Sequence, residues 1–214
     1  MNSQQDSIQA LSEIRDLMHR SSKFLSLSGL SGIFAGITAL IGASVAYLRL
    51  KTDAFNYESS EQMTVLTRRD MIEFILIDGS IVLVVAILLG CFFTIRKAKK
   101  SGQSVWNPVS KRMLVSLLIP LVTGGIFCLA MFYRNMLWVS FPATLIFYGL
   151  ALLNASKYTV RDLEYLGILE VILGLISLFL TGYNLLVWAF GFGVLHIVYG
   201  TLMYFKYERG TYHS

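Results

Sequence analysis

Six long stretches of this chain are apolar and almost free of charge, and they restrict its fold more than any other feature. They cover residues 24–48, 74–95, 113–133, 137–154, 165–183 and 185–205. Each is at least about 18 residues long, which is enough for a helix to cross the hydrocarbon core of a bilayer. Only 14% of the residues are charged, against about 25% in soluble domains. The sequence therefore predicts an all-α, polytopic membrane protein with six transmembrane helices.

The segments outside these stretches are short. Residues 1–23 place Ile8 and Leu11 on one side of a helix with charged residues on the other, which predicts a cytoplasmic amphipathic N-terminal helix. Such a helix lies in the membrane interface, or it binds a protein partner. Residues 24–206 form the expected transmembrane domain, and residues 207–214 form a cytoplasmic tail. Because the loops leave no room for a soluble catalytic domain, any activity has to be built within the membrane or on its faces.

The basic residues predict the orientation of the helices. Most of the 18 Lys and Arg residues fall in the N-terminal segment, in alternate loops and near the C-terminus. Basic residues in short loops are retained on the cytoplasmic side, so both termini are expected inside. This retention accounts for the net charge of +5 without a nucleic-acid partner. The loop after the second stretch is the most basic and offers a surface for anionic lipid head groups, formed by Arg96, Lys97, Lys99, Lys100, Lys111 and Arg112.

Two titratable residues, Glu170 and His196, lie deep within the last two stretches. A tight turn around Tyr183 joins these stretches, which must therefore run antiparallel as neighbours. Glu170 and His196 are equally far from Tyr183 along the chain, so we expect them at one depth and hydrogen-bonded to each other. Burial favours the neutral form of both groups while their attraction favours the ion pair, so they form one coupled titration. Two roles stay open, a buried pair that fixes the hairpin or a site that binds a proton or ligand.

Three more charged residues lie in or beside the second and third stretches. Asp78 falls inside the hydrocarbon, where a carboxylate costs roughly 2.5–3.5 kcal/mol, so it should face protein or water. It either packs between helices or lines a cavity. Glu73 and Arg134 are equally far along the chain from the centre of the basic loop. An ion pair between Glu73 and Arg134 is therefore expected at the outer ends of these two helices.

Two local patterns predict structural detail. Asn107 followed by Pro108 is typical of a helix N-cap with a first-turn proline. Cys91 and Cys128 are expected near opposite faces of the membrane, at depths that differ by roughly 15 Å on helices that rise about 1.5 Å per residue. That separation is too great for a disulfide bond.

The first stretch is rich in small residues, with Ser28, Gly32 and Gly36 at intervals that favour close packing of helices. Within it, the sequence Gly29-Leu30-Ser31-Gly32 resembles the G-x-S-G serine motif of rhomboid intramembrane proteases, and His196 lies on the sixth helix, as the rhomboid histidine does. The serine of that family lies on the fourth helix rather than the first. The histidine helix of the family also has glycines where Tyr199 and Met203 stand here. An intramembrane serine hydrolase that uses Ser31 is therefore a remote alternative.

The segments LSEIRDLMHRSSKFLSLSGLSGIFAG and FGFGVLHIVYGTLMYFKYE resemble an uncharacterised group of six-helix bacterial membrane proteins. This resemblance implies a bacterial cytoplasmic (inner) membrane but no activity. Motifs for metals, haem or nucleotides are absent from the sequence, so no cofactor is expected. We expect a non-enzymatic accessory or scaffold membrane protein with a buried Glu170–His196 pair. The alternative is a small proton- or ligand-handling transporter, channel-like subunit or sensor, which requires water to reach Asp78 or Glu170.

Overall fold

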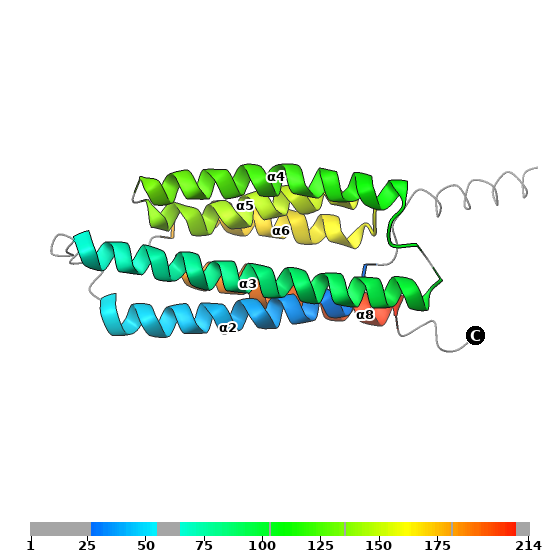
Figure 1. Ribbon diagram of the computed structural model, residues 1–214, viewed down its shortest axis with the longest axis horizontal. Coiled ribbons are helices and arrows are strands. Elements are labelled where there is room, and N and C mark those ends of the chain that lie inside the picture. The colour runs from blue at the N-terminus through cyan, green and yellow to red at the C-terminus, as the bar shows by residue number, and fades with distance from the viewer. Residues whose placement is uncertain (1–26, 55–64, 103, 135, 181, 209–214) are drawn as a thin grey trace, which may run out of the picture.

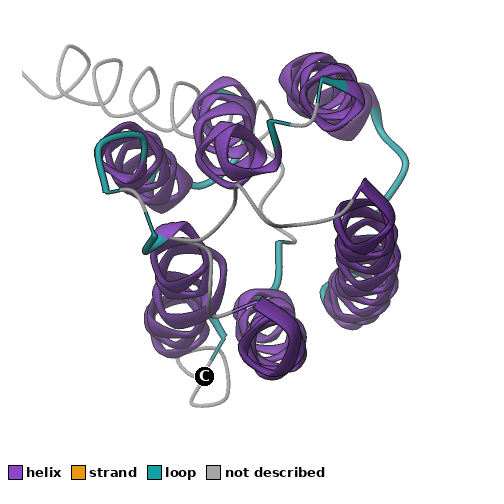
Figure 2. Ribbon diagram, turned by 90° about the vertical axis from the view of Figure 1, so that its left-hand side faces the viewer, coloured by secondary structure: helices purple, strands orange, loops and turns teal. Residues whose placement is uncertain are grey.

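The computed structural model describes residues 27–54, 65–102, 104–134, 136–180 and 182–208, and in these ranges all regular structure is helical. The all-α prediction is therefore confirmed. The helices lie side by side in a bundle (Figures 1 and 2). Their bounds are α2 Gly29–Ala54, α3 Val65–Lys100, α4 Pro108–Tyr133, α5 Leu137–Ser156, α6 Asp162–Ser177, α7 Asn184–Trp188, η2 Ala189–Leu195 and α8 His196–Tyr207.

Five helical segments are long and apolar enough to cross a membrane. Four are single helices, α2 to α5, and the fifth is the continuous run of α7, η2 and α8 over Asn184–Tyr207. The remaining helix, α6, has 16 residues, which span about 24 Å at a rise of about 1.5 Å per residue. It ends at Ser177 rather than at residue 183, because the chain turns through Leu178–Leu180 and reaches Gly182 with a φ of +86°.

The helix ends follow from local sequence. Asn107 caps α4, since its side chain accepts from the Ser110 backbone N–H while the Ser110 hydroxyl accepts from the Asn107 backbone N–H. The predicted cap is therefore confirmed, and α4 runs without interruption through Pro120. The second helix is longer than the predicted apolar stretch. It extends beyond that stretch at both ends, and three lysines lie in its last turn.

The helices fall into two groups. On one side α2 packs against α3 and α8, and on the other α5 packs against α4 and α6 (Figure 1). Glycines permit both close contacts. A Cβ on Gly200 of α8 would lie 2.5 Å from the backbone nitrogen of Ile33, and one on Gly149 of α5 would lie 2.6 Å from the carbonyl oxygen of Gly167. Helices associate in this way where lipid provides no hydrophobic drive.

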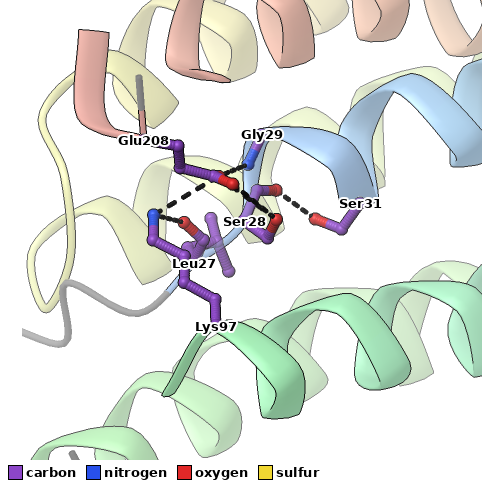
Figure 3. Close-up of polar contacts among 6 residues, drawn as sticks. All are labelled: Leu27, Ser28, Gly29, Ser31, Lys97 and Glu208. Atoms are coloured by element: carbon purple, nitrogen blue, oxygen red, sulfur yellow. Dashed lines mark hydrogen bonds and ion pairs between the residues drawn. The ribbon is translucent and has the colours of Figure 1, made fainter. Parts of the chain in front are cut away.

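A cluster of polar contacts closes the end of the bundle at which α3 and α8 end and α4 begins, which we term the basic end (Figure 3). The carboxylate of Glu208 accepts hydrogen bonds from the Gly29 backbone N–H (2.6 Å) and from the Ser28 hydroxyl (3.2 Å). Lys97 of α3 donates to the carbonyl of Leu27 at 2.7 Å and lies 3.4 Å from Glu208. An acidic group at a helix N-terminus satisfies free N–H groups and opposes the helix dipole. The cluster therefore holds the ends of α2, α3 and α8 together.

A second contact at the basic end joins α6 to α8. Asp162, the first residue of α6, accepts hydrogen bonds from Lys206 (2.8 Å) and from the Tyr207 hydroxyl, and the Tyr199 hydroxyl donates to its carbonyl oxygen. Partial burial alone would raise the pKa of Asp162, but the hydrogen bonds from Lys206 and Tyr207 outweigh it. The pKa therefore lies below its ordinary value of 3.8.

The predicted amphipathic helix at residues 1–23 and most of the tail at residues 207–214 lie outside the described residues, as does the loop at residues 55–64. The boundary of the transmembrane domain at residue 24 is outside them too.

Replacing Gly200 with alanine should destabilise the bundle, because the new methyl group meets the backbone of α2 rather than a movable side chain. We expect a loss of about 1–3 kcal/mol, the usual cost of overpacking, measured by reversible unfolding in detergent. Gly79→Ala is the matched control, since no atom lies within 4 Å of a Cβ at that position. Equal stability of the two variants would show that α2 and α8 are not in this close contact.

The contact of Asp162 with Lys206 should stabilise the fold in a pH-dependent way. Since the folded pKa is below 3.8, the contribution is fully present above that pH and is lost as the pH falls through the folded pKa. The difference in melting temperature between the wild type and Asp162→Asn should therefore be largest near neutral pH and should shrink below about pH 4. Glu164→Gln, at the exposed pair with Arg161, serves as a control, and a difference that is constant with pH would contradict the assignment.

Candidate functional site

Glu170 is the most completely buried charged residue among the described residues, with 0% of its surface exposed. It lies on the face of α6 that also carries Gly167, Gly174 and Ser177, all buried. Gly174 sits so close to α5 that an added Cβ would lie 2.9 Å from the carbonyl oxygen of Pro142. The small residues above and below Glu170 thus bring α5 against α6, and the carboxyl group is enclosed between the helices.

The carboxyl group faces α5 and η2. A Cβ on Gly191 would lie 2.7 Å from Glu170 Oε2 and 2.6 Å from the side chain of Leu145. A larger residue at this point of η2 would therefore displace the Glu170 carboxyl group or the Leu145 side chain. His196 Nδ1 is 3.4 Å from Glu170 Oε1. The structure thus brings together the two residues that were expected at one depth on neighbouring helices.

Both nitrogens of His196 have other partners as well. Nδ1 lies 3.0 Å from the carbonyl oxygen of Gly191, and Nε2 lies 2.8 Å from the hydroxyl of Tyr148. Since a carbonyl can only accept, Nδ1 carries the hydrogen. Nε2 of a neutral ring then accepts from the Tyr148 hydroxyl. A neutral histidine is fully hydrogen-bonded in this arrangement.

Glu170, by contrast, has no hydrogen-bond donor for either carboxyl oxygen among the described residues. The hydrogen on His196 Nδ1 points to Gly191, not to Glu170, although the two side chains are within ion-pair distance. The sequence predicted a direct hydrogen bond between Glu170 and His196, whereas in the structure the two side chains are only in close contact. Such an orphaned carboxyl group is rare in folded proteins and calls for an explanation.

The π-helical segment η2 determines where the ring of His196 points. In a π-helix the backbone hydrogen bonds join residues five apart in the chain. Such segments occur mostly as single turns within α-helices, frequently at functional sites. The ring nitrogen Nδ1 bonds the carbonyl oxygen of Gly191, five residues earlier. The second glycine of this segment, Gly193, packs against α2, where an added Cβ would lie 2.3 Å from the side chain of Leu40. The widened turn thus lies between Glu170 on one side and α2 on the other.

Aromatic rings pack against the ring of His196 and continue along the chain to Trp188. Tyr148 and Phe192 lie 5.3 Å and 5.8 Å from the ring of His196, and they lie 5.0 Å from each other. Trp188 continues the stack at 4.9 Å from Phe192. Rings at these separations attract one another in tilted or offset arrangements. The stack holds the imidazole in a fixed orientation against α5.

Asp78 is not part of this site. It is half-buried on α3 and faces α2, where a Cβ on Gly42 would lie 3.5 Å from its Oδ2. No hydrogen bond joins Asp78 to another of the described residues. Of the two roles considered for Asp78, packing between helices fits this position.

The prediction of an ion pair between Glu73 and Arg134 is wrong. Glu73 instead pairs with Arg69 one turn earlier on α3, with 2.9 Å between Nε and Oε1, and the described residues contain no ion pair between Glu73 and Arg134. The physical reason is that α3 packs on α2 rather than on α4. Two helices joined by a loop of this length need not be neighbours.

Other sequence predictions concern Cys91, Cys128 and Ser31. Both cysteines are free, as predicted. Cys128 is buried in α4, with its sulfur 3.8 Å from the carbonyl oxygen of Ser140. The Ser31 hydroxyl donates to the carbonyl oxygen of Ser28, so it is not the group that contacts His196. Among the described residues no three His, Cys, Asp or Glu side chains form a metal-binding group.

The sequence reasoning missed Tyr148 and Gly191. Tyr148 shares a face of its helix with Thr144, one turn earlier, and this polar pair in an apolar stretch was the available signal. For Gly191 there was none, because a π-helical turn has no sequence signature that periodicity reveals.

Comparisons of the chain with protein-family models, with curated proteins and with solved structures give no match. The site must therefore be interpreted from its own geometry.

The hydrogen bond between Tyr148 and His196 can be measured by a double-mutant cycle. Tyr148→Phe should lower the free energy of unfolding by about 1–3 kcal/mol, because it leaves Nε2 buried without a partner. In a His196→Phe background the same change should cost little. Tyr165→Phe, at a position 53% exposed on α6, is the control for loss of a tyrosine hydroxyl. Additive losses in the cycle would show that the two side chains do not interact.

Proposed function

We propose that this chain is an integral membrane protein that binds and releases a proton at Glu170, as a small proton-handling transporter, channel-like subunit or sensor. The observation that carries this proposal is a carboxyl group with 0% exposure and no hydrogen-bond donor. An ionised carboxylate buried in this way costs several kcal/mol, whereas the neutral acid costs far less. Glu170 therefore holds a proton in the arrangement described.

The neighbouring histidine supplies a way to accommodate the loss of that proton. His196 Nδ1 is 3.4 Å from Glu170 Oε1 and 3.0 Å from the Gly191 carbonyl oxygen. When the Glu170 proton leaves, a small rotation of the ring directs its Nδ1–H from the Gly191 carbonyl to the carboxylate, and the ring stays neutral with Nε2 accepting from the Tyr148 hydroxyl. The two groups thus share their protons as one coupled unit. Such a pair has more than one stable protonation state.

The size of the site favours a proton over a larger ligand. Glu170 Oε2 leaves too little room for even a methyl group on Gly191, and Leu145 lies against the same point with no exposed surface. Among the described residues no further acidic or thiol groups gather there to bind a metal ion.

A non-enzymatic accessory or scaffold protein is the second candidate, and the polar cluster at the basic end favours it. That cluster fixes Leu27 and Gly29, close to residues 1–23, for which the sequence predicts an amphipathic helix that lies in the membrane interface or binds a protein partner. Lys97 is paired with Glu208 in this cluster and is therefore not free to bind lipid. The other basic residues of this loop are exposed, and Lys100 already has a contact of its own. Those that remain available to anionic lipids, with Lys111 also 5.3 Å from the ring of Trp106, are Arg96, Lys99, Lys111 and Arg112.

The orientation and location stay proposals of the same kind. We propose that the basic end faces the cytoplasm, with both termini inside, in a bacterial cytoplasmic membrane. We also propose that the chain is not an enzyme. The hydroxyl of Ser31 is directed to a backbone carbonyl and His196 to Tyr148 and Gly191, so neither contact supports a hydrolase.

Infrared spectroscopy of the protein in lipid tests the proton at Glu170 directly. The wild type at neutral pH should show the carbonyl stretch of a protonated carboxyl group, because the site offers no donor to the ionised form. That band should be lost in Glu170→Gln and kept in Asp78→Asn, the matched control for a carboxyl group elsewhere in the membrane. If Glu170→Gln removes no such band at any pH at which the protein is folded, Glu170 does not bind a proton and the proposal is wrong.

A further inference from the structure

The two sides of the Glu170 site differ in polarity, and this difference indicates from which end the site is reached. The inference rests on the proposed proton at Glu170. The basic end was defined above, and we term the other end, where α5 and α7 begin, the opposite end (Figure 1). Between Glu170 and the opposite end, polar side chains pair across the helices. Between Glu170 and the basic end, the interior is apolar.

The polar side consists of two cross-helix hydrogen bonds, which we term the polar ladder. Trp188 Nε1 donates to the hydroxyl of Thr144 at 3.1 Å. Farther out, the Ser177 hydroxyl donates to Asn184 Oδ1 at 3.0 Å, and these two residues are 1% and 8% exposed. Thr144 is one turn from Tyr148 on α5, and Ser177 is two turns from Glu170 on α6. The ladder thus continues from the residues of the site towards the opposite end.

The apolar side begins one turn away in the other direction. Leu166 lies one turn below Glu170 on α6, and Leu152 lies one turn below Tyr148 on α5. Both are buried in one hydrophobic cluster with Leu163 and Ala155, and Leu195 and Tyr199 pack against it. Beneath this cluster, the contacts of Asp162 with Lys206 and Tyr207 join α6 to α8. Two successive barriers therefore separate Glu170 from the basic end.

Water enters a protein interior only where polar groups receive it, since a buried molecule makes about three hydrogen bonds. The polar ladder offers such groups, and Glu170, whose two oxygens are unpartnered among the described residues, lies two turns from Ser177 on the same helix. Of the residues packed against the hydrophobic cluster, Tyr148 and Tyr199 carry hydroxyl groups, and both are already engaged, with His196 and with the Asp162 carbonyl oxygen. Ser177 is about 10 Å from Glu170 along the axis at about 1.5 Å per residue, so the side chains alone do not complete the path.

We propose that protons reach Glu170 from the opposite end, through water molecules that are received by Ser177, Asn184, Thr144 and Trp188. The hydrophobic cluster closes the site towards the basic end. The polar ladder thereby becomes part of the proton-binding site, and the access to this site is one-sided. If the basic end is cytoplasmic, the site exchanges protons with the outside of the cell in the conformation described.

The rate at which the Glu170 proton exchanges for deuterium tests the route. After transfer to heavy water, the infrared band assigned by Glu170→Gln shifts, and the time course of the shift gives the exchange rate. Thr144→Val and Ser177→Ala should each slow this exchange by about fivefold, the factor expected for one lost hydrogen bond. Tyr199→Phe removes one hydroxyl on the apolar side and is the matched control, which should leave the rate unchanged.

The outcomes separate the route from the proposed function. A band that is present, with a rate that responds to Tyr199→Phe and not to the ladder variants, overturns the route and leaves the proton at Glu170 in place. An absent band overturns both. Rates that do not differ among all the variants also overturn the route.

Labelling of introduced cysteines gives an independent measurement. In a Cys91→Ser background, Ser177→Cys on the ladder and Leu166→Cys in the hydrophobic cluster are compared for reaction with a small, water-soluble methanethiosulfonate. We expect Ser177→Cys to react and Leu166→Cys to remain protected, and the unsubstituted Cys128 provides the background. Faster labelling of Leu166→Cys, or protection of both positions, would contradict access from the opposite end.

Discussion

The rest of the structure depends on the burial of one carboxyl group to which no described side chain donates a hydrogen bond. Glu170 is enclosed between helices with 0% exposure, where an ionisable group is costly. Its position requires α5, α6 and the α7–η2–α8 run to meet closely, which the glycines at 149, 167, 174 and 191 allow. His196, Tyr148 and the aromatic stack then order the side chains where these helices meet. The burial of the polar site and the close packing of these helices therefore depend on each other.

Counting from a turn located part of the site in the sequence, and it did so for a physical reason. The connection at Tyr183 is short, and Gly182 adopts a φ of +86° there. Helices joined in this way must lie against each other, so equal distances from the turn correspond to equal depth, and Glu170 and His196 lie 3.4 Å apart. The same method could not find Tyr148, because α5 is joined to α6 and not to α8. When no short turn joins two helices, counting residues along the chain does not show which of their side chains meet.

The same counting failed at Glu73 and Arg134, and the comparison shows its limit. The segment between α3 and α4 begins after Lys100 and ends at Pro108, which is long enough for the two helices to diverge into different groups (Figure 1). Glu73 then takes the nearest cation, Arg69 on its own helix. The all-helical class and the capped start of α4 were predictable because they depend on composition and on local hydrogen bonds. The end of α6 was not, since an apolar turn has the same composition as an apolar helix.

The π-helical turn also fixes how many residues the last segment can contain. One residue fewer in η2 would rotate all of α8 by about 100° relative to Trp188 and Asn184. Gly200 would then leave the backbone of α2, and Lys206 would leave Asp162. The exposed apolar side chains of this segment can change among apolar types without moving these contacts, whereas the number of residues in η2 cannot. A single deletion in η2 would detach α8 from both groups of helices at once, so the position of α8 depends on the length of this segment more than on the identity of its exposed residues.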